Sequence, residues 1–163
     1  MPLTKSQKKV VLDNVNDIAG TAKTVVFVNF HGLSVGDSTS MRKTLREAGV
    51  KLTVAKKTLA TKAFAAQGIK GEMPPLLGEL AIAYGADIIA PAREVRNFEK
   101  KFDGKFSIMG GVFDGTFKSK DEMTAIASIP SREVLYGMFV NIINSPIQRF
   151  VIAMDQIAKT KTA

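Results

Sequence analysis

The sequence predicts an α+β fold: a ferredoxin-like split βαβ sandwich of four strands with helices, followed by a C-terminal helical tail. Helix-like and strand-like segments alternate through residues 1–128, and setting aside the helix expected over 56–67 as an insertion leaves two βαβ units. Residues 129–163 have a helical pattern only, so we expect a globular domain over 1–128 and a tail over 129–163. A doubly wound parallel sheet is the competing topology, because sequence alone does not decide strand order.

Four segments have the composition and periodicity of strands. Residues 23–30 form a β-branched and aromatic run typical of a buried strand, and residues 50–55 alternate between apolar and polar side chains. Residues 80–85 are the third expected strand. Residues 106–115 are the fourth, and the glycines near its middle indicate a bulge or a site of close packing.

The expected helices are bounded by capping residues and proline. Thr4 and Gln7 form a capping box for the first helix, and Ser34 caps the second. Pro91 suits the first turn of the fourth helix. We therefore expect helices over residues 4–19, 35–48, 56–67 and 91–102, and a short helix that follows the cap at 119–122 and ends before Pro130.

The tail is expected to hold two helices. Ser131 and Glu133 begin the first, over about residues 131–144, and Ser145 and Pro146 interrupt it before a second helix starts. In the second helix, apolar side chains recur on one face: Ile147, Phe150, Val151, Met154, Ile157 and Ala158. Such a stripe either packs on the parent domain or docks another protein, and the Ser145–Pro146 articulation favours docking.

Basic side chains are concentrated in the first part of the chain. The 163 residues carry a formal net charge of +8. Residues 1–62 hold 11 Lys and Arg against 4 Asp and Glu, whereas the remaining residues are almost neutral. A basic surface of this kind indicates nucleic acid first and an anionic membrane second, with a merely solubilising surface as the alternative.

Catalytic and metal-binding constellations are missing from the sequence. The absence of cysteine excludes a disulfide framework, a cysteine nucleophile and a cysteine-based zinc site, and it suits a reducing cytosol. The single histidine, His31, has no partner nearby in the sequence, and neither a phosphate-binding glycine loop nor a nucleophile elbow occurs. We therefore expect no enzyme and no cofactor. No apolar run approaches the roughly 20 residues of a membrane helix, and the N-terminus does not resemble a signal peptide.

Three groups of basic residues are candidates for nucleic-acid contact. They belong to the first three expected helices: Lys5, Lys8 and Lys9; Arg42, Lys43 and Arg46; Lys56, Lys57 and Lys62. The amides that begin the third helix, with Lys56 and Lys57 beside them, suit a phosphate group. Arg42 and Arg46 can fork onto phosphates or stack on unpaired bases. Because aromatic residues are sparse here, we expect recognition of a folded RNA through its backbone and shape.

Several short motifs follow one another in a specific order. The first stretch is VVFVNFHGLSVGDSTSMRKTLREAGVKLTVAKKTLATKA, in which one strand ends in an aromatic-x-Gly-Leu motif and the next leads into Val-x-Lys-x-Thr-Leu. GGVFDG and IPSREVL follow later. In order and spacing, from Thr4 to Lys159, these segments resemble the family of large-subunit ribosomal protein ten, the stalk-base protein, in its bacterial form without the inserted second domain.

The resemblance implies a structural ribosomal protein that anchors the large-subunit stalk. It implies that the N-terminal domain binds large-subunit rRNA beside large-subunit protein eleven, in the bacterial cytoplasm. It also implies that a helix over about residues 146–161 carries dimers of the acidic stalk protein (large-subunit proteins seven/twelve), two by analogy, which recruit translation factors. The positions that fall on the family's N-terminal pattern are Gly32, Leu33, Arg42, Arg46, Lys56 and Thr58.

Two positions depart from the family pattern. Lys57 stands where the family usually has Asn, and His31 where it usually has Arg. The lysine side chain can only donate hydrogen bonds, whereas the asparagine amide can also accept them. At Lys57, attraction to phosphate is therefore retained or increased, and a contact specific to the amide is lost. The His31 exchange lowers the local charge at neutral pH. The alternative function is that of a free-standing RNA-binding translational regulator.

Overall fold

The computed structural model describes residues 5–102 and 104–161. The chain divides into two compact units. The first unit ends at Ile129 and the second begins at Pro130. In chain order, the first unit contains α1 (Lys5–Thr21), β1 (Thr24–Phe30), α2 (Val35–Glu47), β2 (Val50–Val54), α3 (Lys57–Ala66), β3 (Leu80–Gly85), α4 (Ala90–Lys101), β4 (Phe106–Phe113), β5 (Thr116–Lys118) and α5 (Lys120–Ala127). The second unit contains α6 (Arg132–Lys161).

The first unit is built on an antiparallel sheet of five strands in the order β2-β3-β1-β4-β5. β1 and β2 therefore run in the same direction with β3 between them, and β3 and β4 do so with β1 between them. This is the split βαβ arrangement, with α2 and α4 as the crossovers and α3 as an insertion. The ferredoxin-like prediction is confirmed, and the doubly wound parallel alternative is wrong.

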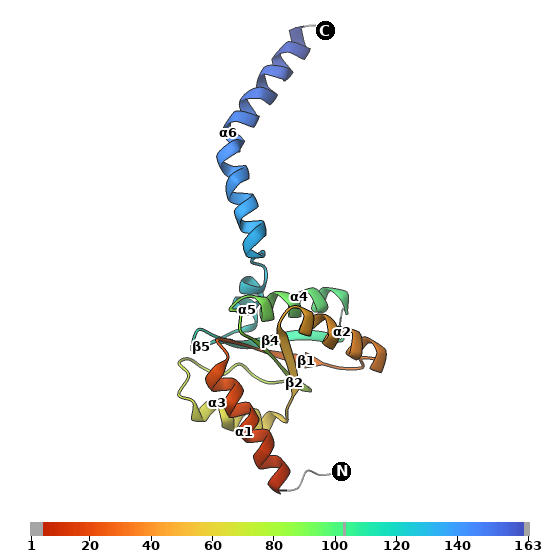
Figure 1. The fold of residues 1–163 in the computed structure, drawn as a ribbon, viewed down its shortest axis with the longest axis vertical. Helices are drawn as coiled ribbons and strands as arrows, with labels where there is room; N and C mark the ends of the chain where they lie inside the picture. The colour runs from red at the N-terminus through yellow and green to blue at the C-terminus, as the bar shows by residue number, and fades with distance from the viewer. Residues whose placement is uncertain (1–4, 103, 162–163) are drawn as a thin grey trace. The chain divides into compact units, whose positions relative to one another are not determined.

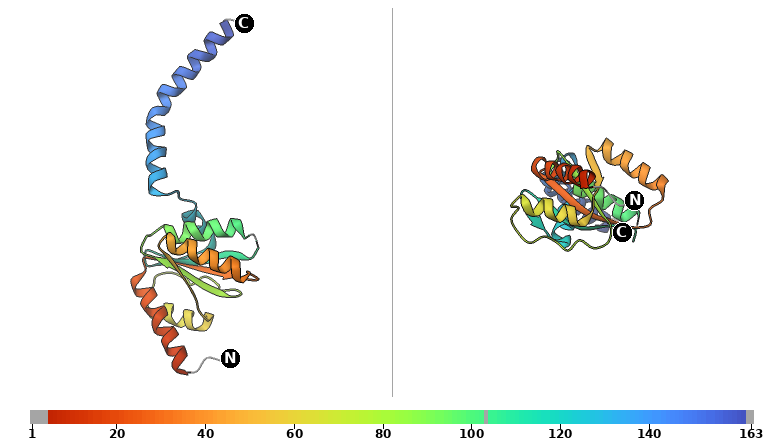
Figure 2. Two further views of the ribbon diagram at one scale, coloured as in Figure 1. Left: turned by 45° about the vertical axis from the view of Figure 1, so that its right-hand side comes forward. Right: turned by 90° about the horizontal axis from the view of Figure 1, so that it is seen from below.

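Helices cover both faces of the sheet. Along β1, Val25 and Phe27 are buried on one face and Val26 and Val28 on the other, as the two-residue period of a strand requires. α1 and α3 pack on the first face, where the ring of Phe64 meets that of Phe27 edge-on with 5.0 Å between centroids. α2, α4 and α5 pack on the second face. Figure 1 shows these two helical layers, and Figure 2 shows α1 beside α3 when the molecule is seen from below.

The predicted fourth strand is β4, but a fifth strand that the sequence did not predict, β5, pairs back on it to form a hairpin. Asp114 and Gly115 both have positive φ, 48° and 70°, and form the tight turn from which β5 pairs back on β4. The expected bulge is confirmed, since the register of β4 against β1 shifts between Phe27 and Val28, where Gly110 has φ +144°. The Asp-Gly pair was the sequence signal for the missed turn.

Serine caps set two of the helix boundaries. The Ser34 hydroxyl accepts a backbone hydrogen bond at the start of α2, and Ser119 forms a full capping box with Glu122 at the start of α5. Thr4, predicted to cap α1, lies outside the described residues. α1 also runs through Gly20, where helix termination was expected, because nothing there requires a left-handed backbone.

α6 is one helix of 30 residues, so the predicted break at Ser145–Pro146 is wrong. Proline removes one backbone donor and strains the preceding turn, but a helix continues past it when the other hydrogen bonds hold. Figure 1 draws α6 as a continuous ribbon that curves along its length. None of the described residues of α6 is buried.

Candidate nucleic-acid interface and docking helix

Two loops that are distant in the sequence lie at the same end of the sheet. β1 and β2 run in the same direction and finish at this end, which we call the β1–β2 end. Gly32 and Leu33 follow β1 there, and Lys56 follows β2. Gly32 has φ +63°, a left-handed conformation that favours glycine and turns the chain toward α2. The structure therefore brings the Gly-Leu motif and the Lys56–Lys57 pair to one end of the first unit.

A hollow of about 620 Å³ opens at the β1–β2 end. Its lining includes Phe30 of β1, Val11 of α1, and Lys56, Lys57 and Thr58 at the start of α3. Lys56 is the N-cap of α3, and within the described residues no side-chain hydrogen bond caps this helix. Because the first amides of a helix carry partial positive charge, an uncapped N-terminus beside two exposed lysines is electrostatically suited to an anion.

The other predicted lysines of α1 and α3 lie on the same side of the sheet as the hollow. Lys8 and Lys9 are exposed and lie within one turn of Val11. Lys62 is exposed beside a second hollow, of about 520 Å³, whose lining it shares with Lys57. Lys5 begins α1, but its side chain lies outside the described residues.

The basic residues of α2 form a separate group. Arg42, Lys43 and Arg46 are all exposed, while Met41 and Leu45 of the same helix are buried in the core. α2 packs on the face of the sheet opposite to α1 and α3. The structure therefore does not bring the three predicted groups onto one helical layer: α2 presents its cations on one side of the sheet, and α1 and α3 present theirs on the other.

The RNA candidates whose side chains are described form no ion pair with a described carboxylate. Within the described residues, ion pairs join Arg93 to Glu94, Arg96 to Glu99, Lys118 to Glu122 and Lys159 to Asp155. None of the described RNA candidates takes part in these pairs. Exposed and uncompensated cations of this kind remain available to a polyanion.

α6 exposes the predicted apolar stripe. The exposed fraction is 66% for Ile147, 67% for Phe150, 59% for Val151, 53% for Met154 and 52% for Ile157, and Ala158 is also exposed. A monomeric soluble protein rarely leaves so many large apolar side chains in contact with water on one element.

The stripe is longer than the sequence reasoning recognised. Leu135, Phe139 and Ile143 are exposed as well and lead to Ile147 in steps of four residues. Together with Phe150, Met154 and Ile157 they follow one face of a single helix. The repeat was visible in the sequence, but dividing the tail at Ser145 and Pro146 concealed it.

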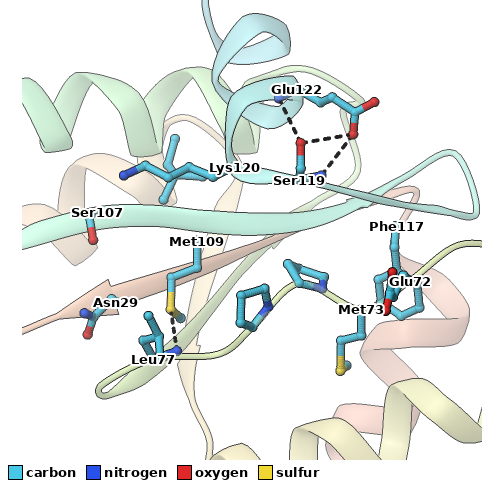
Figure 3. Close-up of a pocket in the computed structure, with 13 residues that line it drawn as sticks. Asn29, Glu72, Met73, Leu77, Ser107, Met109, Phe117, Ser119, Lys120 and Glu122 are labelled. Atoms are coloured by element: carbon cyan, nitrogen blue, oxygen red, sulfur yellow. Dashed lines mark hydrogen bonds between the residues drawn. The ribbon is translucent and has the colours of Figure 1, made fainter.

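A further hollow, of about 810 Å³, lies between the loop that precedes β3 and the segment from β4 to α5 (Figure 3). The Leu77 amide donates a hydrogen bond to the Met109 sulfur at 3.2 Å, which ties this loop to β4. Glu122 accepts a hydrogen bond from the Ser119 amide, and this bond, followed by the one from Lys118, lowers the pKa of the Glu122 carboxyl. Glu122, one of the two glutamates that line this hollow, therefore caps α5, and its lowered pKa is the opposite of what a general base near neutral pH needs.

Metal ligation and membrane insertion find no support in the described part of the chain. Within residues 5–102 and 104–161, no group of three or more His, Cys, Asp or Glu side chains is arranged to hold a metal ion. Over the same residues, no helix combines the length and the apolar character needed to span a bilayer.

Two family models match this chain. The model described as Ribosomal protein L10 matches residues 3–100, and the model described as Ribosomal protein uL10 C-terminal region matches residues 129–163. The chain belongs to the ribosomal protein L10 family. The large ribosomal subunit protein uL10 of Shouchella clausii is 38% identical over 156 residues, which cover 95% of this chain and 93% of that protein.

Other L10 relatives align over a similar extent. The uL10 protein of Lactobacillus helveticus is 36% identical over 159 residues, covering 96% of this chain and 93% of that protein. The uL10 protein of Albidiferax ferrireducens is 35% identical over 163 residues, covering 100% and 91%. Membership of the L10 family makes this chain a ribosome-bound structural protein of the large subunit, active in translation and not an enzyme.

The two L10 matches contain both candidate regions. All the predicted RNA candidates fall within residues 3–100, and α6 falls within residues 129–163. The resemblance seen in the sequence is thus confirmed at the level of the family.

Proposed function

We propose that this L10-family protein anchors the stalk of the large ribosomal subunit in the bacterial cytoplasm. In this proposal, residues 1–128 bind large-subunit rRNA near large-subunit protein eleven, and residues 129–163 carry dimers of the acidic stalk protein, which recruit translation factors. The observation that carries the proposal is α6: a helix with an uninterrupted apolar stripe and no buried residue among those described.

The docking half rests on the length and chemistry of the stripe. From Leu135 to Ile157 it runs about 33 Å at 1.5 Å per residue, enough for more than one helical partner side by side. Helix-in-groove recognition uses anchors at this spacing. Burying one large side chain of this kind contributes roughly 1.5–3 kcal/mol relative to leaving it exposed.

The RNA half rests on exposed, uncompensated cations. Lys56 and Lys57 stand at the uncapped N-terminus of α3, and Arg42 and Arg46 stand one turn apart on α2. Arginine and lysine at such positions bind phosphates, and each neutralised phosphate steepens the salt dependence of binding. The division of the cations between two sides of the sheet suits a folded RNA that wraps this unit.

The proposal is tested with two variants and two ligands. Replacing Arg42, Arg46, Lys56 and Lys57 by Ala should weaken binding to a stalk-base rRNA fragment on the order of 100-fold or more at 0.1 M salt and flatten the salt slope. The matched control replaces four exposed lysines elsewhere on the first unit: Lys23, Lys51, Lys70 and Lys120. Parent-like affinity in the first variant would refute the RNA assignment.

The second variant addresses the docking half. Replacing Phe150, Met154 and Ile157 by Ser should abolish co-purification of the acidic stalk protein while leaving rRNA binding at the parent level. Native mass spectrometry of the parent complex should count two acidic dimers. Retention of the acidic protein by this variant would contradict α6 as the docking helix.

A further inference from the structure

We infer that the RNA-binding surface at the β1–β2 end extends to Lys101 and Lys105, on the connection from α4 to β4, and that these two lysines contact the phosphate backbone. The inference rests on the proposed rRNA binding and deepens it. The positive charge of the sequence is concentrated in residues 1–62. The inference adds two lysines that lie outside this segment.

The connection lies against the Gly-Leu loop. The His31 amide donates a hydrogen bond to the Lys105 carbonyl at 2.8 Å, and Phe30, the last residue of β1, pairs with Phe106, the first residue of β4. β4 therefore begins where β1 finishes. The connections that precede β4 and follow β1 and β2 all lie at the β1–β2 end, together with the hollow lined by Lys56.

Both lysines are exposed and unpaired within the described residues. Arg93 and Arg96, earlier in α4, form ion pairs with glutamates of the same helix, whereas Lys101 and Lys105 form none. The Lys101 ammonium lies 5.8 Å from the centre of the Phe102 ring, a cation–π distance that restrains the side chain where the helix ends.

Phe102 is itself held in place. Its ring stacks on that of Phe98 with 6.2 Å between centroids, and both pack with the core beneath α4. Lys105 is positioned by the backbone, since its amide donates to the Phe102 carbonyl at 3.0 Å and its carbonyl accepts from His31. These contacts hold Phe102 and the Lys105 backbone in place at the β1–β2 end, beside the RNA candidates.

A structural role in α4 does not account for both residues. Lysine in the last turn of a helix complements the helix dipole, and this applies to Lys101. Lys105 lies four residues past the end of α4, beyond the short range of that effect. Its charge therefore has no partner among the described residues, while the neighbouring loops present further cations.

Carboxylates also occur at this end. Asp37 is hydrogen-bonded to Ser34 at the start of α2, and Glu79 lines the hollow beside Lys56. Asp103 lies outside the described residues. Positive residues from separate connections thus lie at the same end of the first unit, which fits the repeated charge of an RNA backbone.

The test measures salt-dependent binding of the full-length chain to a stalk-base rRNA fragment. Replacing Lys101 and Lys105 by Ala should lower the salt slope by about 1.5 and the affinity roughly 30-fold at 0.1 M salt, with the curves converging near 1 M. The single variant Lys105→Ala should account for about half of the slope change. Replacing both by Arg should retain parent affinity, because arginine also neutralises phosphate.

The matched control removes two exposed lysines from the opposite end of the sheet, Lys23 and Lys51, and should leave the slope unchanged. An equal loss in this control, or a parent-like slope in the Lys101/Lys105 variant, would overturn the inference. If Lys56→Ala with Lys57→Ala weakens binding while the Lys101/Lys105 variant does not, the inference alone fails. If the parent does not bind the fragment, the proposed function fails with it. Unchanged melting temperatures verify that each variant is folded.

Discussion

The bulge in β4 depends on a single glycine. Gly110 has φ +144°, and a Cβ built on it would lie 2.7 Å from the Lys118 carbonyl oxygen and 2.8 Å from Pro74 Cγ. Gly110→Ala should therefore destabilise the protein by about 2–4 kcal/mol, from backbone strain and overpacking together. In contrast, Gly20→Ala has open space in a helix and should stabilise by about 0.5–1 kcal/mol. Urea unfolding of both variants measures the change in the free energy of unfolding. Equal changes in the two variants would contradict this account.

At the scale of residues, the sequence predicted two serine caps and the glycine bulge of β4, but no contact between residues far apart in the chain. Ser34, Ser119 and Gly110 could be assigned because their roles depend on neighbours a few positions away. The hydrogen bond between His31 and Lys105 joins residues far apart in the chain, and no local pattern announces it. For this reason the sequence-based RNA candidates all come from residues 1–62 of the chain, and the α4–β4 connection became a candidate only from the structure.

Pro146 is a point of reduced stability inside α6. Its missing N–H leaves the helix without one backbone hydrogen bond, and its ring crowds the carbonyl one turn earlier. Pro146→Ala should slow hydrogen exchange of the amides around residues 143–150 by at least about tenfold, since proline costs about 3 kcal/mol in a helix interior. Ser145→Ala, which leaves the backbone donors intact, should change the same rates by less than about threefold. Unchanged protection in the proline variant would show that the turn already forms without strain.

At the scale of elements, type was predictable and continuity was not. Hydrophobic periodicity assigned the helices of the first unit and the strands up to β4, with ends within about two residues, but it divided α6 into two helices. The sequence predicted a helix break at Ser145–Pro146 that does not occur, and it did not predict the chain reversal at Asp114–Gly115. In α6 the apolar stripe runs through the proline, whereas the Asp-Gly pair reverses the chain into β5. An apolar repeat that continues on the same helical face beyond a proline indicates an unbroken helix, and this criterion separates the two cases.

At the scale of the whole molecule, the split βαβ order follows from pairings that no single segment contains. β3 inserts between β1 and β2, and β1 between β3 and β4, so each strand of the core depends on a partner from the other half. Val25 to Val28 are buried on alternate faces, so β1 is covered on both faces. This alternation does not determine which strands pair with β1. Both candidate topologies were compatible with that alternation, and the pairing register distinguishes them.

The first unit should keep its stability without the tail. Its core is formed by residues that precede Pro130, and none of the described residues of α6 is buried. A chain that ends at Ile129 should therefore melt cooperatively within about 2 °C of the full chain. In the full chain, a helix with no buried side chain among its described residues is marginal in water, so the α6 signal in far-UV circular dichroism should fade gradually below that transition. Adding the acidic stalk protein should make the loss of this signal cooperative, because partner binding stabilises the bound helix. The control is the full chain with Phe150, Met154 and Ile157 replaced by Ser, which should melt like the parent and show no such response. A fragment that melts more than about 5 °C lower would show that residues 130–163 support the core.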